Sequence, residues 1–194
     1  MKPFASFVKL QLNVNYGISA LKYRLFREKK KRYEPVLIIL AIVFSFIPLL
    51  SMYTVFMAGV FAAGATLGQP EIVLGMALVI SQVIILFFGL FYIMGTFYFS
   101  KDVEFIVPLP LKPYEVIAGK FIVIMINEYL TSMPILIPPV FIYGIGMGEG
   151  VLYWIKAVLI LLTAPVVPLA VAAVLIVILM RFVNFRRHKD LFAI

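Results

Sequence analysis

The chain has 194 residues, of which 64% are hydrophobic and 13% charged, and its mean hydropathy is +1.10. A soluble domain of this size has too little interior to hide so much apolar surface, so the composition excludes a soluble class and indicates a membrane protein. Cysteine is absent, which excludes a disulfide framework and a cysteine-based metal site. The formal net charge of +8 is compatible with nucleic-acid binding, but the basic residues follow the pattern of membrane topology instead.

Residues 1–34 are polar and basic. Apolar side chains recur there in steps of three and four from Phe4 to Leu25, with Gln11 filling the one gap, which predicts an amphipathic helix. Basic residues beside this stripe suit a helix that lies on an anionic inner leaflet, although Gly17 weakens the pattern. Two alternatives stay open, namely a solvated extension of the first span and a helix packed on other parts of the protein.

Four apolar segments follow, at about residues 35–67, 71–99, 116–147 and 151–180. Each is longer than the roughly 20 residues that cross a hydrocarbon core, so each must tilt, kink or project beyond it. Prolines mark candidate breaks, at Pro48, Pro134, Pro138, Pro139, Pro165 and Pro168. We interpret the segments as kinked single spans. The fold class is then all-α, a polytopic membrane protein with four transmembrane helices preceded by an amphipathic N-terminal interfacial helix.

The basic residues set the predicted orientation. All 17 Lys and Arg except Lys156 lie in residues 1–34, in the 100–120 loop or in the tail, residues 181–194. The positive-inside rule makes these three regions cytoplasmic, on either side of a membrane domain at residues 35–180. We therefore expect a multi-pass protein of the cell membrane with both termini in the cytoplasm. The bilayer is an expected partner, and nucleic acid is not.

The loop between the second and third spans is an apolar elbow stiffened by Pro108, Pro110 and Pro113. Apolar residues flanked by charges often mark a docking surface. Packing on the protein's own inner surface, or in the headgroups, stays open as the alternative. The predicted partner-binding residues are Val107, Pro108, Leu109, Pro110, Leu111, Lys112, Pro113, Tyr114 and Glu115.

Polar residues interrupt the third span around Glu128. An ionisable group at membrane depth is expensive and is a functional candidate by default. A structural role, near the inner interface or paired with a neighbouring helix, is the alternative. Gln82 in the second span is a candidate hydrogen-bond partner. The intramembrane polar candidates are Glu128, Asn127 and Gln82.

Enzyme chemistry finds little support in the residues. The only histidine, His188, lies in the basic tail, and no nucleophile–base pair or metal cluster is evident. The sequence has no G-x-x-x-x-G-K-[ST] phosphate loop. The glycine run at 144–150 indicates a flexible outer turn, with close helix packing through Gly144 and Gly148 as the alternative. We therefore expect no enzyme activity, catalytic residue, metal or cofactor in this chain.

The order of these features, together with the elbow, resembles the type-2 ATP-binding-cassette (ABC-2) export permeases. A Leu-Pro-Leu-x-x-x-x-hydrophobic-x-x-Gly-Lys loop recurs between the second and third spans of that family. The matching positions are Leu109, Pro110, Leu111, Glu115, Val116, Gly119 and Lys120. The resemblance covers the whole chain as the N-terminal portion of a longer permease, because such units usually have six spans.

The resemblance implies a permease subunit, or its N-terminal part, of an ATP-driven exporter. The 107–115 loop would then couple the spans to a separate ATPase subunit, which would hold ATP and Mg, and two permease units would form a dimer. The alternative function, from a different class, is a small non-transporting membrane protein that anchors or regulates partners through its basic cytoplasmic segments.

Overall fold

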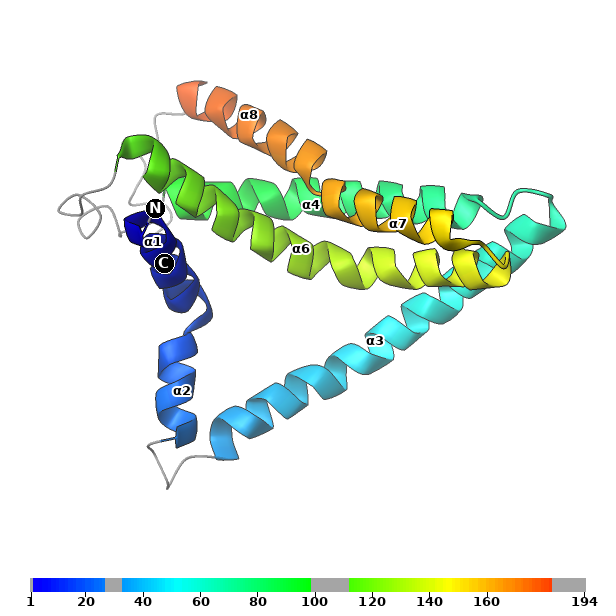
Figure 1. The fold of residues 1–194 in the computed structure, drawn as a ribbon, viewed down its shortest axis with the longest axis horizontal. Helices are drawn as coiled ribbons and strands as arrows, with labels where there is room; N and C mark the ends of the chain where they lie inside the picture. The colour runs from blue at the N-terminus through cyan, green and yellow to red at the C-terminus, as the bar shows by residue number, and fades with distance from the viewer. Residues whose placement is uncertain (1, 27–32, 99–111, 183–194) are drawn as a thin grey trace.

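The computed structural model describes residues 2–26, 33–98 and 112–182, and these form helices joined by short turns, with no strand among them (Figure 1). Four helical stretches are long and apolar enough to cross a membrane, which confirms the all-α class with four membrane-length helices. They are α3 (Tyr33–Thr66), α4 (Ile72–Phe97), α6 (Pro113–Gly146), and α7 (Val151–Thr163) together with α8 (Val166–Phe182). Such a set fits a multi-pass membrane protein.

The N-terminal segment forms two helices, α1 (Lys2–Tyr16) and α2 (Ile18–Phe26), where the sequence predicted one. Gly17 separates them at φ +60°, a conformation that glycine adopts without steric penalty. Asn13 Oδ1 accepts hydrogen bonds from the backbone N and the Oγ of Ser19, both at 2.8 Å, and these bonds fix the turn. α1 packs against α6 (Figure 1), and its location at a membrane interface stays a prediction.

Three helices, α4, α6 and α8, form the core of the bundle (Figure 1). The buried residues of α4 recur at every fourth position, so they line one face of the helix. That face packs against α6 and α8, where Ile93, Ile124 and Leu169 meet in one apolar cluster. The buried residues of α4 are Val73, Ala77, Ser81, Ile85, Gly89 and Ile93.

The prolines have different effects in the third and fourth spans. α6 continues through its three internal prolines as one helix, whereas the fourth span divides at Ala164 and Pro165 into α7 and α8. Pro139 has no N–H to donate to the carbonyl of Ile135. The hydroxyl of Tyr53 on α3 donates to that carbonyl instead, at 2.9 Å. A neighbouring helix thus supplies the donor that the proline lacks.

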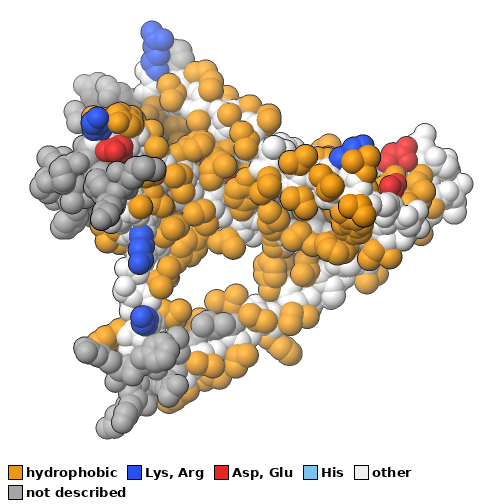
Figure 2. Space-filling model, viewed as in Figure 1, with side chains coloured by type: hydrophobic (Ala, Val, Ile, Leu, Met, Phe, Trp, Pro, Cys, Tyr) orange, Lys and Arg blue, Asp and Glu red, His pale blue; other side chains and the backbone are white. Residues whose placement is uncertain are grey.

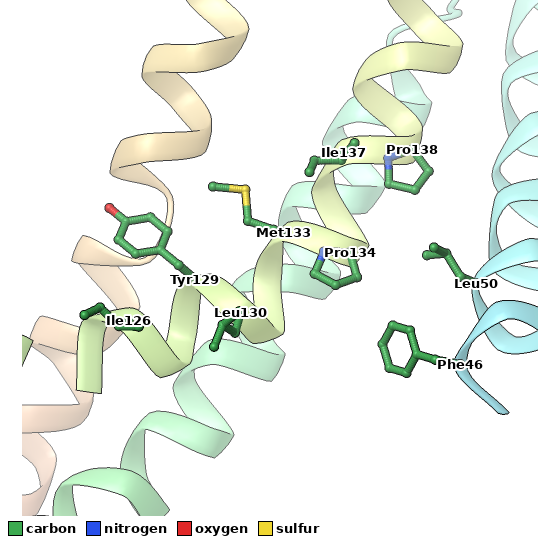
Figure 3. Close-up of a pocket in the computed structure, with 9 residues that line it drawn as sticks. All are labelled: Phe46, Leu50, Ile126, Tyr129, Leu130, Met133, Pro134, Ile137 and Pro138. Atoms are coloured by element: carbon green, nitrogen blue, oxygen red, sulfur yellow. The ribbon is translucent and has the colours of Figure 1, made fainter. Parts of the chain in front are cut away.

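α3 diverges from the other spans (Figure 1), and none of the described residues in its most apolar stretch is buried. Figure 2 shows an opening between α3 and the rest of the molecule, with apolar side chains over the middle and charged side chains toward the ends. Next to this opening, Phe46 and Leu50 of α3 point toward Pro134 and Pro138 of α6 (Figure 3). They help to line an apolar groove of about 470 Å³.

Candidate functional site

The polar residues of the third span lie on the buried side of α6. Asn127, Glu128 and Ser132 are 9%, 0% and 1% exposed, although they sit in the middle of a membrane-length helix. Thr131 behaves differently, because its hydroxyl donates to the carbonyl of Asn127 within the same helix at 3.0 Å. The structure therefore places two of the three polar candidates, Asn127 and Glu128, inside the protein.

Asn127 connects α6 to the end of α1. Its Oδ1 accepts a hydrogen bond from the hydroxyl of Tyr16 and another, at 3.5 Å, from Nδ2 of Asn15. An amide oxygen has two lone pairs, so both bonds can form together. Burial, and secondarily the Tyr92 hydroxyl, raises the pKa of Tyr16 above its usual value. The hydroxyl therefore stays protonated and able to donate at neutral pH.

Gln82 bonds to the backbone of the fourth span and not to Glu128. Its Nε2 donates to the carbonyl of Ala164 at 2.9 Å. In a continuous helix this carbonyl would accept from residue 168, but Pro168 has no N–H. The hydroxyl of Tyr129 also donates to a carbonyl of the fourth span, that of Leu162 near the end of α7.

Glu128 is enclosed by α4 and α8. A Cβ placed on Gly89 would lie 3.6 Å from Glu128 Oε1, 3.2 Å from Leu169 Cδ1 and 3.5 Å from Ala172 Cβ. The carboxyl group thus lies beside Gly89, where an added Cβ would be in ordinary van der Waals contact with it and in tighter contact with Leu169. Neither Glu128 oxygen has a hydrogen-bond partner among the described residues, and the same is true of Ser132 Oγ.

The first part of the predicted partner-binding loop, residues 107–111, lies outside the described residues. The remainder opens α6. Pro113 stands in the first turn, and the backbone N of Lys112 donates to Glu115 Oε2 at 2.8 Å. Lys112 Nζ also lies 5.8 Å from the centre of the Tyr114 ring. Contact between this loop and a partner stays a prediction.

Two residues of the loop motif have clear structural roles. A Cβ on Gly119 would lie 2.6 Å from Cε1 of Phe7, so only a glycine lets α1 approach α6 so closely. Lys120 is 4% exposed, and its Nζ donates to the carbonyl of Thr96 at 2.9 Å, in the last turn of α4. These two positions therefore hold α1 and the end of α4 against α6.

The glycine run connects α6 to α7. Gly148 has φ +65° and no atom near its missing side chain, as expected for a turn. Gly144 is buried, and a Cβ there would lie 2.6 Å from Cε1 of Tyr153 and 2.9 Å from Cζ2 of Trp154. Close packing thus applies to Gly144 and not to Gly148.

A protein-family model described as "Putative ATP-binding cassette" matches residues 27–194. No curated protein and no solved structure matches the chain.

This match corrects four expectations from the sequence. The family is that of an ATP-binding cassette and not the type-2 export permease family, so the assignment to that permease family is wrong, and so is the inferred permease subunit. The alternative of a non-transporting anchor finds no support either. ATP-binding cassettes usually hydrolyse ATP, so the expectations of no enzyme activity and of ATP and Mg only on a partner are corrected too.

The described residues nevertheless do not fit ATP. A phosphate loop needs backbone N–H groups at a helix N-terminus and a lysine. The glycine run at the start of α7 contains Glu149 and no lysine, and three apolar grooves among the described residues are lined by no Lys or Arg. No described residue is therefore assigned to ATP. Because the match extends over most of the chain, including all four membrane-length helices, the protein belongs to the ATP-binding-cassette family that this model describes.

Proposed function

We propose that this protein works in ATP-driven transport across a membrane, as a membrane-embedded member of the ATP-binding-cassette family. The observation that carries the proposal is that the family match at residues 27–194 includes all four membrane-length helices. The part of the chain that defines the family is thus largely made of helices that suit a bilayer, and this favours an activity exerted within the membrane.

We propose that α4 and α6 move together as one unit during transport. These helices pack along one another, and Lys120 ties the start of α6 to the carbonyl of Thr96 near the end of α4. The proposed partner-binding residues Val107 to Glu115 run from the segment between them into the first turn of α6. A component of the transport assembly that binds this segment would act on both core helices at once.

The role of ATP is tested with the full chain in lipid nanodiscs. Photolabelling with azido-ATP and Mg²⁺ should be saturable and should be competed by unlabelled ATP. Because phosphate groups bind Lys and Arg, the labelled peptides are expected in the basic segments of the sequence. At a free ATP concentration of 100 times Kd, binding should raise the free energy of unfolding by about 2.7 kcal/mol. Absence of both saturable labelling and stabilisation would contradict a direct role for ATP on this chain.

The proposed orientation is tested with single cysteines, which the cysteine-free sequence makes simple to interpret. Cysteines at Gln69 and Glu149, in the two outer turns, should react with a membrane-impermeant thiol reagent in intact cells. A cysteine at Ser100 should react only after the membrane is permeabilised. The reverse pattern would show that the positive-inside rule fails for this chain.

A further inference from the structure

Glu128 lies near the middle of α6, and its surroundings are unusual for an acid. The side chain is fully buried, and both of its oxygens lack a hydrogen-bond partner among the described residues. A Cβ on Gly89 of α4 would lie 3.6 Å from Glu128 Oε1 and within 3.5 Å of the apolar side chains of Leu169 and Ala172 of α8, so these groups meet around Gly89. The helices thus exclude water from the carboxyl group without supplying a donor to it.

An ionised carboxylate is not stable in such a place. Burying an isolated charge costs so much that the group neutralises instead. The titratable and charged side chains of the helices do not stabilise an ionised Glu128 by hydrogen bonding, because none of them bonds to a Glu128 oxygen. They include Tyr16 of α1, Tyr53 of α3, Tyr92 of α4, Lys120 and Tyr129 of α6, and Arg181 of α8.

A metal cation does not fit the space either. Ca²⁺ and Mg²⁺ take six or more oxygen ligands. Besides the two oxygens of Glu128, the unpartnered buried side-chain oxygen among the described residues is Ser132 Oγ, four residues along the same helix. Asn127 Oδ1 already accepts from Tyr16 and Asn15. A proton needs no such cage, and it converts one carboxyl oxygen from an acceptor into a donor.

We propose that Glu128 is a proton-binding site within the membrane domain, occupied while α4, α6 and α8 are packed together. A protonated carboxyl group can donate to Ser132 Oγ after a small side-chain rotation, because residues four apart lie on the same helix face. If the interface with Gly89 and Leu169 opens, water reaches the carboxyl group and the proton can leave. Proton binding is then linked to the packing of the core helices, whichever component binds ATP.

The test is infrared spectroscopy of the full chain in lipid nanodiscs at about pH 7, where an exposed glutamate, with a reference pKa of about 4.3, is ionised. The wild-type protein should show the C=O stretching band of a protonated carboxylic acid. The band should be lost in Glu128→Gln, which keeps a neutral side chain of similar shape. It should persist in Glu149→Gln, the matched control, because Glu149 is exposed in the turn before α7.

Three results would overturn the proposal. The first is a wild-type spectrum without the protonated band, and the second is a band that survives in Glu128→Gln. The third is loss of helical circular dichroism in Glu128→Gln, because a neutral amide should replace a neutral acid without unfolding the protein. A carboxylate band that changes when sodium or magnesium is added would identify a cation site instead, and would also refute a proton site.

Discussion

Replacing Gln82 by leucine removes the side chain that donates to the carbonyl of Ala164 at 2.9 Å. Leaving a buried acceptor unsatisfied costs about 1–3 kcal/mol in soluble proteins. Hydrogen bonds between helices in membranes contribute less, about 0.6 kcal/mol on average and up to about 1.7. We therefore expect Gln82→Leu to lower the free energy of unfolding by about 1 kcal/mol, which changes the ratio of folded to unfolded protein about fivefold.

A second substitution makes the test specific. Pro168→Ala restores the N–H that can donate to the carbonyl of Ala164 within the helix. In that background Gln82 is no longer needed as the donor, so Gln82→Leu should have almost no effect. The two substitutions together should then show a coupling energy of about 1 kcal/mol. At independent sites, by contrast, the changes in unfolding free energy add to within about 0.5 kcal/mol.

The assay is reversible unfolding in mixed micelles, followed by the fluorescence of Trp154, the single tryptophan. Trp154 packs beside Phe141, with ring centroids 5.1 Å apart, so its signal reports the packing of α6 and α7. Gln69→Leu, in an exposed turn, is the matched control and should be additive with Pro168→Ala. An equal effect of Gln82→Leu in both backgrounds would refute the inference that Gln82 replaces the donor lost at Pro168.

Other substitutions test the contacts that hold the helices together. Gly119→Ala should detach α1 and destabilise the protein by about 1–3 kcal/mol through overpacking. Gly95→Ala is the control, because Gly95 has open space around it, and it should stabilise the protein by up to about 1 kcal/mol. Equal rates of limited proteolysis of α1 in the two variants would contradict this. Tyr53→Phe should cost about 1 kcal/mol in the same unfolding assay because the carbonyl of Ile135 loses its donor, and an unchanged midpoint would show that this bond contributes nothing. Lys120→Met should loosen the end of α4, seen as faster amide hydrogen exchange there, and unchanged exchange would argue against the role of its ammonium group.

Length and hydropathy determined the number of membrane-length helices, because a bilayer sets the length of a spanning helix and lipid offers no partner for an unpaired backbone group. The sequence also located the polar candidates, since Asn127 and Glu128 stand out in an apolar helix. The start of α6 followed from local chemistry too, with Pro113 in the first turn and Glu115 beside the positive helix end.

Tertiary structure decided where these helices face and what their polar groups bind. Along α4 almost every residue is apolar, so hydrophobic periodicity does not distinguish the buried face from the lipid-facing one. A small residue such as Gly89 can be identified as part of the buried face only once the position of the neighbouring helix is known. Gln82 was a candidate hydrogen-bond partner of Glu128, yet it bonds to the carbonyl of Ala164, between α7 and α8.

Tertiary structure also decided how each proline affects its helix. Their positions mark where the backbone loses a donor, but not whether the helix breaks there. α6 stays continuous at Pro139 with Tyr53 as a substitute donor, whereas the chain divides at Pro165 into α7 and α8. Tyrosines in membrane segments resemble ordinary apolar side chains in the sequence. Whether a hydroxyl reaches a freed carbonyl depends on another helix far along the chain, and only the packed structure brings the two together.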